Sequence, residues 1–95
     1  MYARVASFEG GDLERVRQFS DQQRSSGQAP EGLRRVLLLH DHDQNRRLFI
    51  TFFDSPEAIQ AAEARFEAMG DEIGEDVRGK RTSVATYEVI FDDTP

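Results

Sequence analysis

The centre of the chain reads LFITFFDSPE, residues 48–57, and this stretch joins a strand to a helix. Its first six residues are mostly β-branched or aromatic, which predicts a strand over 47–53. Ser55 can cap the free N–H groups of a following helix, Pro56 suits the first helical position, and Glu57 favours the positive end of the helix dipole. The stretch therefore predicts a strand that leads directly into a well-capped helix.

The predicted helix carries its apolar residues at spacings of three and four, which keeps them in one narrow stripe. These residues are Ile59, Ala62, Phe66, Met69 and Ile73. Gly70 is expected to end the regular helix and to leave Ile73 on a separate turn.

The remaining segments are predicted outward from this centre. Strand formers predict a strand over 1–8, and apolar residues at every third position predict an amphipathic helix over 12–26. A strand over 32–40 and a polar turn over 41–46 complete a hairpin with the central strand. Residues 82–91 predict the last strand, so the element order is βαββαβ.

This order predicts an α+β, ferredoxin-like fold, in which two helices cover one face of a four-stranded antiparallel sheet. Ninety-five residues are expected to form a single domain over 1–95.

Both faces of the predicted sheet are apolar. In the central strand, Leu48, Ile50 and Phe52 lie on one face, while Phe49 and Phe53 lie on the other. Two helices can cover only one of these faces, and large exposed apolar patches usually mark protein contacts. The sequence therefore predicts a homodimer in which the sheets of two copies pack together.

The sequence resembles the dimeric α/β barrel group, which includes antibiotic-biosynthesis monooxygenases and small haem-degrading proteins. The resemblance covers nearly the whole chain and rests on residues 2–5, 48–58 and 81–89. It implies two facing sheets across a dimer, helices outside, and a ligand pocket between sheet and helices. Oxygenases of the group use Asn, Trp and His or Arg; this chain has no Trp, and Asn45 lies in the predicted turn, so no catalytic residue carries over.

The amino-acid composition limits the kinds of binding partner and chemistry that are expected. Twelve basic and 18 acidic residues give a net charge of −6, which disfavours nucleic acid, and the short basic runs such as Arg46-Arg47 are expected to be solvated. The absence of cysteine excludes thiolate chemistry and is compatible with a reducing compartment. No membrane span, signal peptide or cofactor is predicted, and a soluble cytoplasmic protein is expected.

A ligand site is predicted between the sheet and the helices. Phe19, Phe66 and Met69 either wall a cavity for a small apolar or aromatic molecule or fill that space as core. Arg4 and Glu88 interrupt apolar strands, so they form a buried pair, hold a ligand anion or reach water at the rim. Tyr87 either presents its phenol to a substrate oxygen or packs as core.

His40 and His42 have a spacing that two metal ligands can share, but no third ligand is placed by the sequence, and histidines that flank a hairpin are more often solvent-exposed polar residues. No metal site is predicted, and no catalytic residue is assigned. Three functions stay open: a binding module for a small apolar ligand, a cofactor-independent monooxygenase-like enzyme, and a structural or regulatory protein.

Overall fold

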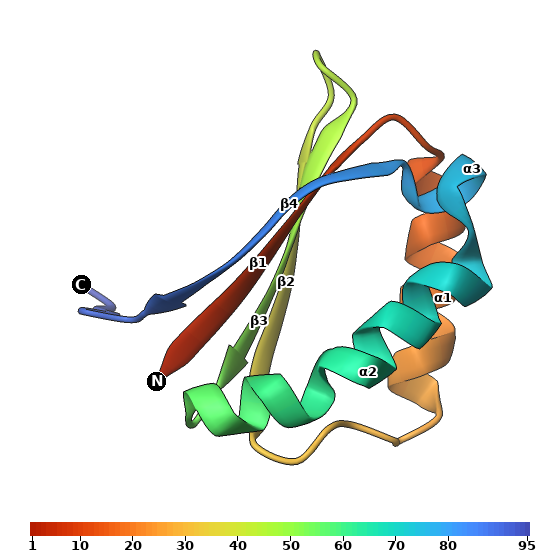
Figure 1. Cartoon of the computed structure of the whole chain (residues 1–95). Helices are drawn as coiled ribbons and strands as arrows, with labels where there is room; N and C mark the ends of the chain where they lie inside the picture. The colour runs from red at the N-terminus through yellow and green to blue at the C-terminus, as the bar shows by residue number, and fades with distance from the viewer.

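The computed structural model describes residues 1–95 and contains one four-stranded sheet with three helices on one side of it (Figure 1). The strands are β1 (Tyr2–Glu9), β2 (Leu33–Asp41), β3 (Arg46–Phe53) and β4 (Lys80–Glu88). The helices are α1 (Leu13–Ser25), α2 (Pro56–Ile73) and the short α3 (Glu75–Arg78). Every strand pair is antiparallel, and the strand order is β2-β3-β1-β4. The predicted ferredoxin-like fold is therefore confirmed.

Local signals place the two long helices. Asp12 caps α1 by accepting from Arg15 N, and Ser55 caps α2 by accepting a 3.1 Å hydrogen bond from Ala58 N. Pro56 stands in the first turn of α2, where its missing N–H costs nothing. The helix start predicted at Ser55 and Pro56 is confirmed.

Two predicted boundaries were wrong. α2 continues through Gly70 to Ile73 and stops at Gly74, whose φ of 81° glycine adopts readily. β4 ends at Glu88 rather than at residue 91, because β4 pairs only with β1 and Tyr2 is the last partner in that ladder. One further backbone bond, from Val89 N to Met1 O, continues the direction of the strand.

The register assigns each side chain to a face. Arg4 lies opposite Thr51, and Ala6 lies opposite Phe49, so these four side chains share the face toward the helices. The other face, which we call the open face, carries Val5, Leu37, Leu39, Leu48, Ile50, Phe52, Ala85 and Tyr87. No helix covers the open face (Figure 1).

The core lies at one end of the sheet, where β3 runs into α2. Phe53 is fully buried against Ile59 and Ala62, and Phe66 packs edge-on to Phe53 with ring centroids 6.1 Å apart. Leu33 from β2 also packs against this group. The core thus holds the start of α2 on the sheet.

Backbone contacts tie the opposite end together. Gly11 and Gly79 approach so closely that a Cβ built on Gly11 would lie 2.5 Å from Gly79 N. Arg47 donates to Arg78 O at 2.8 Å and to Asn45 Oδ1 at 3.1 Å. The expectation that Arg47 is solvated was wrong, because it points to the helix side and is buried under these contacts. Burial lowers the pKa of Arg47.

Candidate functional site

Two neighbouring cavities lie between the sheet and the helices. The first, about 390 Å³, is lined by Arg4, Arg78 and Arg81, and we call it the arginine cavity. The second, about 770 Å³, is lined by His40 and His42, and we call it the histidine cavity. They share the wall residues Phe19, Ser20, Leu38, Phe49, Phe66 and Met69. The space between sheet and helices is therefore open along these shared walls.

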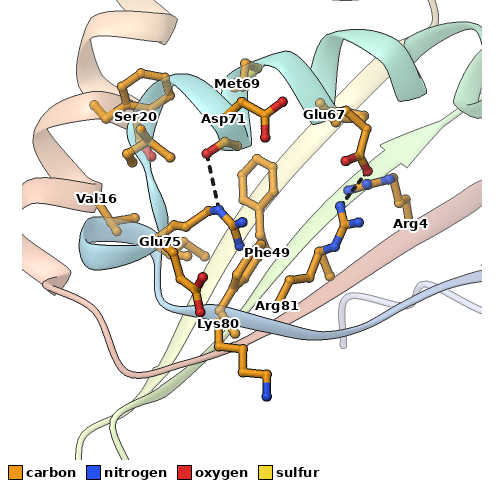
Figure 2. A pocket seen from close by; sticks show the side chains of 18 residues that line it. Arg4, Val16, Ser20, Phe49, Glu67, Met69, Asp71, Glu75, Lys80 and Arg81 are labelled. Carbon is orange, nitrogen blue, oxygen red and sulfur yellow. Dashed lines mark hydrogen bonds and ion pairs between the residues drawn. The ribbon is translucent and has the colours of Figure 1, made fainter.

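The predicted apolar walls meet in this space. Phe19 comes from α1, Phe66 and Met69 come from α2, and all three are half-buried. Sequence reasoning missed the sheet residues Leu38 and Phe49, although alternation along β3 places Phe49 on the face of Phe53. Figure 2 shows Phe49 and Met69 with the charged side chains of the arginine cavity.

Arg4 lies inside the space between the sheet and the helices, and its ion-pair partner is Glu63 rather than Glu88. Only 2% of Arg4 is exposed. Its Nε donates to Glu63 Oε1 at 2.6 Å, its Nη2 donates to Oε2 at 3.2 Å, and its guanidinium lies 4.5 Å from the Phe66 ring centroid. Two parallel bonds and an aromatic face compensate a buried cation well. Glu63 precedes Phe66 by three positions, so the two side chains lie on the same face of α2. The helical period therefore indicated that Glu63 faces the same space as Phe66, where it meets Arg4.

Tyr87 and Glu88 do not line either cavity, which corrects their predicted place between sheet and helices. Tyr87 lies opposite Ala3, so the alternation of β4 turns it to the open face, where it is 58% exposed. Glu88 lies opposite Tyr2 on the face toward the helices, two residues along β4 from Thr86, the partner of Arg4, and it is exposed on an edge strand. Of the alternatives left open for Arg4 and Glu88, the buried pair is therefore excluded, and Glu88 reaches water.

Charged residues form the rim of the arginine cavity. Arg81 Nη1 donates to Glu67 Oε1 at 2.5 Å, as Figure 2 shows beside Arg4. This hydrogen bond lowers the pKa of Glu67 below its ordinary value. Arg78 donates to the carbonyl oxygens of Gly70 and Gly79, at 3.2 Å and 3.1 Å. One ion pair and two hydrogen bonds to backbone carbonyl oxygens therefore hold these rim side chains in place.

The floor of the histidine cavity carries polar atoms without partners. Thr51 Oγ1 and His40 Nδ1 are both buried and make no hydrogen bond. Burial lowers the pKa of His40, and the positive charges of His42 and Arg47 act in the same direction. Unpartnered buried polar atoms are uncommon in folded proteins, so these two atoms are candidates for hydrogen bonds to a bound molecule.

The two histidines touch each other but assemble no larger cluster. Their rings meet edge-on with centroids 4.5 Å apart, and no group of three His, Cys, Asp or Glu side chains with metal-binding geometry is present. Two imidazoles leave at least half of a tetrahedral coordination sphere to water.

We expect the melting temperature to be unchanged by a chelator, because the two histidines have no third side chain beside them with which to hold a cation firmly. Thermal unfolding followed by circular dichroism, with and without EDTA, tests this. A loss of several degrees that one added metal restores would contradict it.

Comparisons with solved structures find the same fold elsewhere. The chain superposes on a candidate antibiotic biosynthesis monooxygenase from Deinococcus radiodurans with a TM-score of 0.70, at 14% identity, over 100% of this chain and 98% of that one. It is similar to the heme-degrading protein MhuD of Mycobacterium tuberculosis, with a TM-score of 0.59 and 18% identity over 99% and 100% of the chains. A dimeric ferredoxin-like protein from an uncultured marine organism has a TM-score of 0.59 at 14% identity, over 99% and 91%.

No family model and no curated protein sequence matches the chain. At 14–18% identity the structural likeness establishes a shared fold. It confirms at the level of fold the resemblance seen in the sequence. None of the helices is long and apolar enough to cross a membrane.

Proposed function

We propose that this protein binds a small apolar or aromatic molecule in the arginine and histidine cavities. The observation that supports this most is that Phe19, Phe66 and Met69 line open space instead of filling it. Volumes of about 390 and 770 Å³ fall within the range of ligand sites, roughly 300–1,000 Å³. Apolar and aromatic walls supply binding free energy through buried area, and a few polar groups orient the ligand.

Two of the three arginines that line the arginine cavity already have carboxylate partners. Arg4, the most deeply buried cation of the arginine cavity, already shares two hydrogen bonds with Glu63. Arg81 is paired with Glu67 in the same way. An anionic ligand would have to compete with these carboxylates, whereas an uncharged molecule leaves both pairs intact.

The same proposal includes a homodimer formed through the open face. Leu39 and Leu48 lie opposite each other on this face and are 47% and 36% exposed. A second copy offers the same apolar surface, so two open faces can pack around a two-fold axis. A solved neighbour with this fold is itself a dimeric ferredoxin-like protein, which supports the assembly.

We expect 2-naphthol to bind with measurable heat at micromolar to millimolar concentration, and Met69→Trp to weaken that binding at least about tenfold. Met69 lines both cavities, so an indole in its place occupies the space that the ligand needs. Ala61→Trp adds the same ring to an exposed position of α2 and is expected to bind like the wild type. Isothermal titration calorimetry gives the affinities, and the proposal fails if no heat of binding appears at millimolar 2-naphthol.

A cofactor-independent monooxygenase is the second candidate. The observation in its favour is that solved neighbours such as the Deinococcus protein are named as candidate antibiotic biosynthesis monooxygenases. Oxygen uptake in the presence of 2-naphthol distinguishes it from a binding module. Uptake that disappears in Met69→Trp and persists in Ala61→Trp would establish turnover in the cavity, and binding without uptake would favour a carrier or sensor.

A further inference from the structure

Two polar side chains stand side by side in the floor of the cavities. Arg4 on β1 and Thr51 on β3 are direct partners in the antiparallel register, so their Cβ atoms lie about 5 Å apart on the helix face. Arg4 is 2% exposed and Thr51 is 1% exposed. Arg4 lines the arginine cavity and Thr51 lines the histidine cavity, so the pair spans the junction of the two.

Both side chains keep unused hydrogen-bonding capacity. Arg4 gives Nε and Nη2 to Glu63, and its third nitrogen, Nη1, makes no hydrogen bond yet is not sealed from solvent. Thr51 Oγ1 has no partner at all. A rotation of about 120° around χ1 moves the threonine hydroxyl to another of the staggered positions on Cβ, so the O–H is not confined to one direction.

The surroundings define what these donors can hold. The Phe66 ring lies against the Arg4 guanidinium, and Phe49 meets Phe66 edge-on with centroids 6.3 Å apart. A molecule at this junction thus lies against aromatic surface and has the Arg4 guanidinium and the Thr51 side chain in the adjoining floor. Because Glu63 neutralises Arg4, the complementary group is an oxygen that accepts hydrogen bonds without a charge of its own.

We infer that Arg4 and Thr51 form the specificity-determining pair of the site and that its ligand is an uncharged aromatic carbonyl compound. This inference rests on the proposed ligand function. In the complex, the carbonyl oxygen accepts from Arg4 Nη1 and from Thr51 Oγ1, while the aromatic body lies among the shared apolar walls. Binding satisfies the one floor hydroxyl that the protein itself leaves without a partner.

Three naphthalenes of similar shape test the inference by calorimetry. 2-Acetonaphthone presents the neutral carbonyl, 2-isopropenylnaphthalene replaces that oxygen with a CH₂ group, and 2-naphthoate presents an anion. We expect the ketone to bind about tenfold more tightly than the hydrocarbon, because two hydrogen bonds form only with the oxygen. We expect 2-naphthoate to bind more weakly than the ketone, since it competes with Glu63 for Arg4.

Substitutions then assign the preference to residues. Thr51→Val keeps the shape of the side chain and is expected to reduce the preference for the ketone over the hydrocarbon about threefold, whereas Thr51→Ser keeps the hydroxyl and the preference. The double variant Arg4→Met with Glu63→Met removes both charges together, so that no buried carboxylate is left unpaired, and it is expected to reduce the preference further. Thermal unfolding of each variant verifies that it is folded.

The outcomes separate the two proposals. Equal affinity for the ketone and the hydrocarbon, a preference unchanged in Thr51→Val, or tightest binding of 2-naphthoate would overturn the carbonyl inference while leaving the cavity as a ligand site. Failure of all three compounds to bind at millimolar concentration would overturn the proposed function and the inference with it.

Discussion

Leu48→Glu is expected to convert the proposed dimer into a monomer of 10.8 kDa. Leu48 lies on the open face beside Leu39, with Ser7 opposite it on β1, and no basic side chain is among these direct neighbours. Sheet-to-sheet packing would bury the new carboxylate in both copies without a partner, at a cost of several kcal/mol. Because each 1.4 kcal/mol changes an equilibrium tenfold, the dimer dissociation constant is expected to rise at least about a thousandfold.

Size-exclusion chromatography with light scattering at micromolar concentration measures this change directly. Ala61→Glu supplies the matched control, since it also places a carboxylate at an exposed apolar position but on α2, away from the open face. The control is expected to keep the mass of the wild type. A wild-type protein that is already a stable monomer would contradict the proposal that a second copy covers the apolar open face.

Gly11→Ala is expected to destabilise the fold strongly, and Gly10→Ala only mildly. Both glycines have φ of 79°, a conformation in which an L side chain costs about 1 kcal/mol. A Cβ on Gly10 meets nothing within 4 Å, whereas a Cβ on Gly11 overlaps the Val77 carbonyl oxygen and lies 2.5 Å from Gly79 N. These neighbours are backbone atoms, so relieving the clash requires the β1–α1 loop to move away from α3 and β4.

The clash adds roughly 2 kcal/mol or more to the conformational cost, which brings Gly11→Ala to about 3 kcal/mol. For a domain of this size, that corresponds to a fall in melting temperature of roughly 12–24 °C, against roughly 4–8 °C for Gly10→Ala. The two variants are compared at one protein concentration, because dimerisation makes the melting temperature depend on it. Similar melting temperatures for the two variants would contradict the close packing of Gly11 against Gly79.

Much of the fold follows from local patterns. Ser55 and Pro56 place the start of α2 within the chain, and the alternation in residues 48–53 separates the two faces of β3. The end of β4 was mispredicted because tertiary pairing decided it: β4 stops where β1 offers no further partner. The end of α2 was mispredicted because glycine is tolerated inside a helix, so α2 passes Gly70. Helical spacing correctly brought Phe66 and Met69 toward one space.

The polar part of the site was harder to predict. Placing Tyr87 requires the exact register of β4 against β1, and a shift of one residue turns a side chain to the other face. Pairing Arg4 with Glu63 requires the position of α2 over the sheet, because the two residues are 59 positions apart in the chain. Arg47 seemed solvated because nothing in its neighbours along the chain reveals that Arg78 O lies above it.

The sequence by itself determined the order of elements, the helix starts and the apolar character of both sheet faces, because these depend on propensities and periods carried by neighbouring residues. Tertiary structure alone decided that the helices leave cavities above the sheet, that Glu63 neutralises Arg4, and that Thr51 keeps an unpartnered hydroxyl. Those features depend on distances between segments remote in the chain, and periodicity along one segment carries no information about such distances.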